Sequence, residues 1–200
     1  LKKYKKEKIE KKDKRDLISN VKALILHKVG SIIVSNTDNI LISSFIGLST
    51  VGIYSNYSMI INAIKTIINQ VFASITASVG NLNAKENTEK SQDIFLKITF
   101  INFWIVTVIS AIIIVVLNDF ISIWIGEEYL LEFPVLIIIL INFFLYEMRQ
   151  TLFIYKNTYG LLYQDRYVPI VEGIINLIAS IILVKFWGII GIFLGTIIST

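Results

Sequence analysis

The stretch ITFINFWIVTVISAIIIVVL, residues 98–117, holds twenty consecutive residues without a charged side chain. A membrane-spanning α-helix needs about 20 mostly apolar residues. Lipid offers no partner to free backbone N–H and C=O groups, so only helices and closed barrels cross a membrane. A barrel needs strands of about ten residues that alternate in polarity, and this stretch does not alternate. It therefore predicts a transmembrane helix in an all-α integral membrane protein.

The composition of the whole chain supports this class. The 200 residues are 54% hydrophobic and 17% charged, whereas a soluble domain has about 25% charged residues. The sequence has no cysteine, which excludes a disulfide framework and a cysteine-based zinc site. His27 is the one histidine, and no Gly-rich phosphate loop or His/Glu metal motif is present. We therefore expect no metal, no cofactor, no nucleic-acid partner and no enzymatic activity.

Residues 29–84 must fold back on themselves. Only Asp38 and Lys65 are charged among these 56 residues. A single helix of that length would extend about 84 Å, against a hydrocarbon core about 30 Å thick. Gly47 and Gly52 flank a Ser-Thr pair and predict the turn between two spans.

Three polar segments separate the later apolar runs. Residues 81–93, 118–132 and 156–167 are expected to form loops, and 118–132 is expected to include a short helix at the membrane surface. The chain starts with Leu and stops inside an apolar run, so we expect it to be a piece of a longer protein. The predicted spans are 29–48, 53–79, 95–117, 133–155 and 168–187, with a truncated sixth span at 189–200.

The basic residues predict the orientation. Residues 1–28 hold eleven of the 19 Lys and Arg, and we expect a solvated cytosolic linker or an arm held on anionic lipid. If this tail is inside and the spans alternate, 17 of the 19 basic residues lie on the inner side. Cytosolic loops are enriched in Lys and Arg, so the N-terminal tail is predicted to be cytosolic.

Several predicted spans carry polar side chains on one face. In the second span Ser55, Ser58, Asn62, Lys65 and Asn69 follow at spacings of three, four, three and four, which places them on one side of a helix. Polar residues inside a membrane usually face a cavity or a protein partner. We therefore predict a hydrophilic pathway, which is typical of a transporter. Its candidate residues are Asp38, Ser58, Asn62, Lys65, Asn69, Asn142, Glu147, Arg149, Glu172 and Asn176.

Other interpretations of these residues remain open at this point. Asp38 and Lys65 could form an ion pair between adjacent antiparallel helices. Glu147, Arg149 and Glu172 could lie near the inner membrane interface. Four tyrosines at four-residue spacing could touch a sugar or isoprenoid, although an interfacial aromatic belt is favoured: Tyr155, Tyr159, Tyr163 and Tyr167.

Five segments resemble a known family. They are SNTDNILISSFIG (35–47), VGIYSNY (51–57), ASVGNL (77–82), GLLYQDRYVP (160–169) and GIIGIFLGTIIST (188–200). Together they resemble the oligosaccharide flippase, or polysaccharide transporter, family within the multidrug/oligosaccharidyl-lipid/polysaccharide exporter superfamily. The resemblance covers about residues 17–200.

The resemblance implies a transporter with two six-helix lobes around a central cavity. Such proteins move undecaprenyl-diphosphate-linked oligosaccharides across the bacterial cytoplasmic membrane for capsule, O-antigen or exopolysaccharide assembly. This chain resembles the second lobe, with residues 1–28 as the linker from a missing N-terminal lobe. Its expected partners are therefore membrane lipid, the lipid-linked substrate and that first lobe.

Chemical roles can be assigned to the candidate residues on this basis. Lys65 and Arg149 could attract a diphosphate or acidic sugars, and the asparagine amides could bind hydroxyl groups. The acidic candidates could titrate if transport is ion-coupled. Two rivals are a multidrug exporter of the same superfamily and a membrane-embedded polysaccharide polymerase or ligase.

Overall fold

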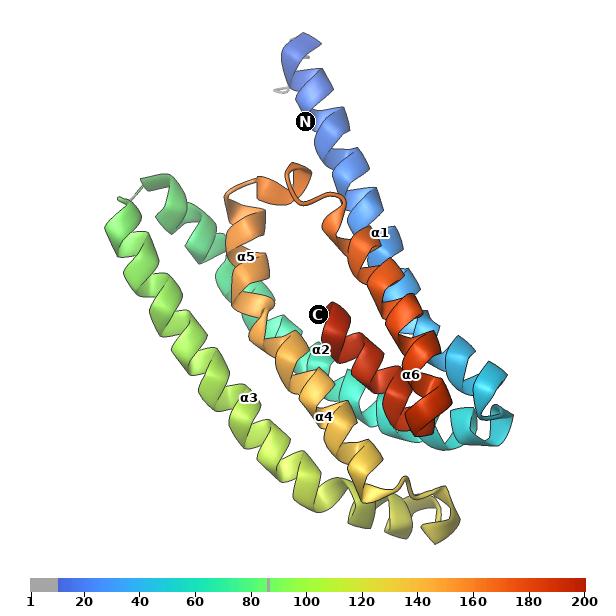
Figure 1. Ribbon diagram of the computed structural model, residues 1–200. Coiled ribbons are helices and arrows are strands. Elements are labelled where there is room, and N and C mark those ends of the chain that lie inside the picture. The colour runs from blue at the N-terminus through green and yellow to red at the C-terminus, as the bar shows by residue number, and fades with distance from the viewer. Residues whose placement is uncertain (1–10, 86) are drawn as a thin grey trace, which may run out of the picture.

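The computed structural model describes residues 11–85 and 87–200, and every regular element within them is helical. The predicted all-α fold is therefore confirmed. Figure 1 shows the helices as long, roughly antiparallel rods. In chain order they are α1 (Lys11–Phe45), α2 (Leu48–Lys85), α3 (Thr88–Ile125), η1 (Glu127–Tyr129), α4 (Phe133–Met148), α5 (Gln150–Thr158), η2 (Leu161–Tyr163) and α6 (Val168–Ser199).

Four helical segments of the described residues are long and apolar enough to cross a membrane. They are Leu48–Lys85, Thr88–Ile125, Phe133–Thr158 and Val168–Ser199. Their outward faces carry large apolar side chains such as Val115 and Ile123, which are 70% and 88% exposed. Exposed apolar faces of this extent fit a lipid surrounding. The chain is thus a polytopic membrane protein.

Helix α1 is longer than the sequence predicts. It runs from Lys11 through the expected linker boundary at residue 28 and on to Phe45 as one helix. Lys and Arg, which are common in its first part, are good helix formers, so nothing local ends the helix there. The part of the linker before residue 11 lies outside the described residues. Helix α1 is not among the four segments with span-like length and composition.

The connections on either side of α2 are shorter than expected. Gly47 has φ +135°, a conformation that favours glycine, and α2 begins at the next residue. The prediction of a loop at residues 81–93 is wrong, because α2 continues to Lys85 and α3 begins at Thr88. Asn87 caps α3, because its side chain accepts a hydrogen bond from the Lys90 N–H at 2.9 Å. Such a cap lets polar residues start a helix.

The loop predicted at 118–132 is also mostly helical. Helix α3 extends to Ile125, and the one-turn helix η1 follows it. The hydroxyl of Tyr57 on α2 forms hydrogen bonds to two other segments at this end of the molecule. It donates to Asn118 Oδ1 at 2.8 Å and accepts from the Leu131 N–H at 2.9 Å. Tyr57 is fully buried, so α2, α3 and the segment before α4 are held together here.

Helix α6 is a hairpin of two helical halves. Its backbone reverses at Gly188, which has φ +54°, and the second half returns beside the first (Figure 1). The reversal falls between the predicted spans 168–187 and 189–200. A side chain at Gly195 would collide with Ser180, and the Ser180 hydroxyl donates to the Ile192 carbonyl at 2.9 Å. The Gly-x-x-x-Gly pair Gly191/Gly195 therefore permits close helix packing.

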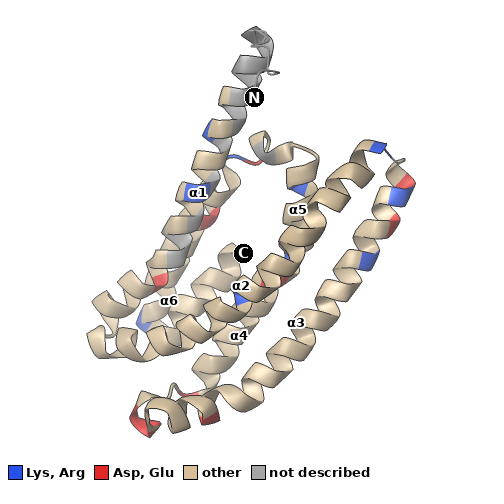
Figure 2. Cartoon of the chain, turned by 180° about the vertical axis from the view of Figure 1, so that it is seen from behind, with Lys and Arg blue, Asp and Glu red and all other residues tan. Residues whose placement is uncertain are grey.

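Helices α1 and α6 form one group, and α2, α3, α4 and α5 form the other. In Figure 1 α1 and the first half of α6 run side by side, and the second half of α6 lies between them and α4. Gly30 of α1 touches Pro169 at the start of α6. Figure 2 shows basic residues at the end where α1 begins, α2 meets α3 and α5 ends, whereas acidic residues cluster where α3 leads to α4.

Candidate functional site

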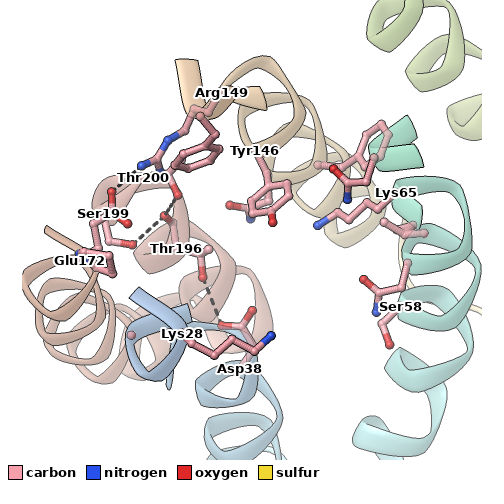
Figure 3. Close-up of a pocket in the computed structure, with 18 of the residues that line it drawn as sticks. Lys28, Asp38, Ser58, Lys65, Tyr146, Arg149, Glu172, Thr196, Ser199 and Thr200 are labelled. Carbon is pink, nitrogen blue, oxygen red and sulfur yellow. Dashed lines mark hydrogen bonds and ion pairs between the residues drawn. The ribbon is translucent and has the colours of Figure 1, made fainter. Parts of the chain in front are cut away.

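A cavity of about 770 Å³ lies between the two helix groups. Residues from α1, α2, α4, α5 and α6 line it. Charged and polar side chains point into it from several of these helices (Figure 3). The volume falls within the range of about 300–1,000 Å³ that is typical of ligand pockets. The cavity is therefore the candidate binding site.

Eight of the ten candidate residues line this cavity. On α2 the polar stripe faces it because Ser58, Asn62, Lys65 and Asn69 share one side of a continuous helix. The structure does not test what these residues do in transport, so their role stays a prediction. The eight lining residues are Asp38, Ser58, Asn62, Lys65, Asn69, Asn142, Arg149 and Glu172.

Glu147 and Asn176 do not line the cavity. Both side chains are fully buried. Glu147 lies in the last turn of α4, and its backbone carbonyl accepts a hydrogen bond from Asn102 of α3 at 2.8 Å. Asn176 lies inside the α6 hairpin, where its amide donates to Thr196 at 2.9 Å. Each residue thus contacts neighbouring helices instead of the cavity.

Lys65 is the basic side chain that α2 contributes to the cavity wall. Its Nζ lies 4.4 Å from the centre of the Tyr146 ring, which is a favourable cation–π distance. Figure 3 shows it reaching from α2 toward Tyr146. No ion pair joins Lys65 to Asp38 within the described residues. The alternative of a direct Asp38–Lys65 ion pair is therefore wrong for this conformation.

Asp38 instead belongs to a hydrogen-bonded chain across three helical segments. The Thr196 hydroxyl donates to Asp38 Oδ1 at 3.1 Å and accepts from the Asn176 amide at 2.9 Å. This chain joins α1 to both halves of α6. Thr196 was not among the candidate residues, because the segment 189–200 is otherwise strongly apolar. Its spacing of three residues from Ser199, which also lines the cavity, could have indicated a polar face.

Arg149 and Glu172 form an ion pair at the cavity wall. Arg149 Nη2 lies 2.6 Å from Glu172 Oε1, and the two side chains are 26% and 24% exposed. Arg149 occupies the break between α4 and α5. A helix break leaves carbonyl groups without intrahelical partners. The pair links this break to the first turns of α6.

A second ion pair, Lys156–Asp165, joins α5 to the segment before α6. Both residues also line the cavity. The guanidinium of Arg166 lies between two rings, 4.1 Å from the centre of Tyr163 and 4.6 Å from that of Tyr167. Because residues 156–167 were expected to be an interfacial loop, sequence reasoning did not select Lys156 or Asp165.

The four tyrosines at four-residue spacing do not share one environment. Tyr155 is buried, and its hydroxyl donates to the Ser91 carbonyl at 3.2 Å. Tyr159, Tyr163 and Tyr167 are more than 40% exposed. A single continuous aromatic face is therefore wrong, since Gly160 ends α5 in a left-handed conformation.

These features define a helical membrane protein of transporter type with a polar cavity between two helix groups. The family described as polysaccharide biosynthesis protein matches residues 3–134, which is about two thirds of the chain. The chain belongs to this family, and it has a role in polysaccharide biosynthesis or transport. The match covers α1 to α3 and ends at the start of α4.

No curated protein and no solved structure gives a significant match to the chain.

Proposed function

We propose that this chain is the second lobe of a flippase for undecaprenyl-diphosphate-linked oligosaccharides in a bacterial cytoplasmic membrane. The proposal rests on the family membership, which concerns polysaccharide biosynthesis, and on the polar cavity within a membrane bundle. A missing first lobe would supply the other wall of the pathway. The substrate, the first lobe and surrounding lipid are its proposed partners.

The observation that carries the proposal is the position of Lys65. Its ammonium lies at the cavity wall beside Tyr146. Among the described residues, the carboxylates of Glu147 and Asp38 attract it, but neither forms an ion pair with it. A cation at membrane depth is costly unless it serves a partner or a passing ligand. A diphosphate supplies the opposite charge, and it forms strong charge-assisted hydrogen bonds with an ammonium group.

The remaining polar groups fit the sugar part of such a substrate. Asn62, Asn69 and Asn142 line the same cavity. Each amide can donate and accept hydrogen bonds, which suits hydroxyl groups. Glu147 and Asn176 are not assigned to sugar contacts, since they lie outside the cavity lining.

The distribution of basic residues supports the proposed orientation. Lys85, Lys90 and Lys97 lie near the α2–α3 connection, and Lys156 and Arg166 lie near the α5–α6 connection. These connections lie at the end of the molecule where α1 begins (Figure 2). Cytosolic segments are enriched in such residues. We therefore place this end, with the N-terminal tail, in the cytosol.

The test compares Lys65→Ala with wild type in the full-length protein expressed in its host. Loss of the ammonium removes an attraction worth about 1.4 kcal/mol, or tenfold in binding. We expect surface polysaccharide to fall about tenfold, with lipid-linked glycan accumulating on the inner leaflet. Lys65→Arg keeps the charge and should retain most of the polysaccharide. Lys97→Ala is the matched control, because Lys97 is exposed and, among the residues that the structure describes, pairs only with Asp93 at 2.6 Å.

Three outcomes would contradict the proposal. Unchanged surface polysaccharide in Lys65→Ala would exclude a central role for this residue. Unpolymerised units accumulating outside would favour a polymerase. Altered drug susceptibility with normal polysaccharide would favour a multidrug exporter.

A further inference from the structure

Glu147 is an acidic side chain in the protein interior. It is fully buried in the last turn of α4. Neither carboxylate oxygen has a hydrogen-bond partner within the described part of the chain. An ionised carboxylate is costly to bury without hydrogen bonds, because it loses its hydration and nothing replaces it. The negative charge of Glu147 therefore depends on a cation nearby.

Lys65 of the cavity wall is that cation. Among the described residues its ammonium is the charge that attracts the Glu147 carboxylate, and Glu147 attracts it more strongly than Asp38 does. The geometry agrees, since Lys65 Nζ lies 4.4 Å from the ring centre of Tyr146, the residue next to Glu147. The two groups form no direct ion pair in the described part of the chain. The carboxylate thus leaves the ammonium able to contact a ligand in the cavity.

The other charged groups at the cavity wall have partners of their own. Asp38 of α1 accepts a hydrogen bond from a hydroxyl of α6 at 3.1 Å, which favours its ionised form. Arg149 at the α4–α5 break and Glu172 of α6 pair with each other at 2.6 Å. Glu147 is therefore the acid whose ionisation depends most on Lys65.

The remaining neighbours of Glu147 do not replace Lys65. From α3 the uncharged Asn102 donates a hydrogen bond to the Glu147 backbone carbonyl at 2.8 Å and leaves the carboxylate unpaired. On α5 the basic residue Lys156 is paired with Asp165. Loss of the attraction from Lys65 would thus leave a buried negative charge without compensation, which is strongly unfavourable.

A diphosphate at Lys65 would cause this loss. Its oxygens form charge-assisted hydrogen bonds with the ammonium, and its own negative charge disfavours a second ionised acid nearby. We propose that Glu147 takes up one proton when a diphosphate binds to Lys65, so that the binding of substrate and of a proton are linked. The proton comes from the solvent and bonds to a carboxylate oxygen, and no other covalent bond changes.

This inference rests on the proposed function, because it takes the diphosphate ligand of Lys65 from it. What it adds is regulation of the same site. Linkage between two ligands is reciprocal. Protonation of Glu147 therefore strengthens diphosphate binding by the same factor by which the diphosphate strengthens proton binding.

The test is isothermal titration calorimetry of the full-length protein in detergent with farnesyl diphosphate, in two buffers that differ in their enthalpy of ionisation. The difference in heat between the buffers gives the number of protons taken up per ligand bound. Any protonation of the ligand itself contributes to every variant, so comparison with Glu147→Gln isolates the proton at Glu147. Wild type should take up about one proton more than this variant. Asp119→Asn, which changes an exposed acid of α3, is the control and should behave as wild type.

A second variant and a second measurement cover the case in which Glu147→Gln does not fold. Glu147→Met replaces the carboxyl group with an apolar side chain of similar length and allows the same comparison. Infrared difference spectroscopy of wild type needs no variant. Binding of farnesyl diphosphate should produce the C=O band of a newly protonated carboxyl group, and absence of this band overturns the inference.

The outcomes separate this inference from the proposed function. Farnesyl diphosphate binding with equal proton uptake in wild type and the Glu147 variants overturns the inference and leaves the proposed function standing. Loss of the extra proton in Asp38→Asn, with retention in Glu147→Gln, also overturns the inference alone. Absence of farnesyl diphosphate binding to wild type contradicts the proposed function and, with it, the inference.

Discussion

Arg149 Nη2 lies 2.6 Å from Glu172 Oε1, so one ion pair connects the α4–α5 break to the first turns of α6. Both side chains are about one quarter exposed. Removing one partner leaves the other partly buried charge without compensation. We expect Arg149→Ala and Glu172→Ala each to lower the free energy of unfolding by about 1 kcal/mol, a value between those of exposed and buried pairs. A double-mutant cycle in detergent measures the coupling.

The exposed pair Lys97–Asp93 provides a matched control for this cycle. Its atoms are also 2.6 Å apart, but the side chains are 64% and 56% exposed. We expect a coupling of about 0.5 kcal/mol or less there. Equal couplings for the two pairs would mean that the Arg149–Glu172 contact contributes no more than a surface interaction.

Gly195 is required for the close packing within α6. A Cβ at this position would lie 2.6 Å from the Ser180 backbone nitrogen and 2.7 Å from its Cα. Backbone atoms cannot move aside cheaply, so Gly195→Ala should destabilise the protein by at least about 2 kcal/mol. Thermal unfolding of the purified protein measures the effect. Gly52→Ala should be neutral or slightly stabilising, because no atom of the described residues beyond its own helix lies within 4 Å of its Cβ position.

Tyr57 should contribute to stability through its hydroxyl. Tyr57→Phe leaves the Leu131 N–H and the Asn118 side chain without this partner, and an unsatisfied buried group costs about 1–3 kcal/mol. We expect a lower unfolding temperature for Tyr57→Phe. Tyr129→Phe changes an exposed ring near the same end and should have no measurable effect. Similar unfolding temperatures for the two variants would contradict this account.

Thr196 should hold α1 against the α6 hairpin. Thr196→Val keeps the shape of the side chain but removes the group that donates to Asp38 and accepts from Asn176. We expect a loss of about 1–3 kcal/mol in the free energy of unfolding. Thr66→Val is the control, since the Thr66 hydroxyl donates only to the Asn62 carbonyl of its own helix at 2.8 Å. A larger loss in Thr66→Val would refute the proposed link.

The fold class and part of the site could be predicted because they depend on local sequence. Twenty uncharged and mostly apolar residues at 98–117 require a helix in lipid. The spacing of Ser58, Asn62, Lys65 and Asn69 places them on one face of α2. The helix ends were harder to predict. Residues 81–93 are polar enough for a loop, yet an asparagine cap and a short connection keep most of them helical.

The remaining features depend on contacts between distant segments. Glu147 stands beside the polar line that includes Arg149, and its backbone carbonyl accepts a hydrogen bond from Asn102 of α3. Thr196 contacts Asp38 across 158 positions of the chain. Neither arrangement follows from spacing within one helix. The packing of α6 on α1 and of α4 on α3 determines both.

Helix α1 is one continuous helix of 35 residues, so its two ends move together when it tilts. It contacts α6 from Gly30, which touches Pro169, to Asp38. The residues of α1 before Gly30 span about 28 Å at 1.5 Å per residue. If α1 tilts by about 10° about the Gly30–Pro169 contact, its first turn moves by about 5 Å. A small change in the packing of α1 on α6 would thus displace the basic end of α1 by several ångströms.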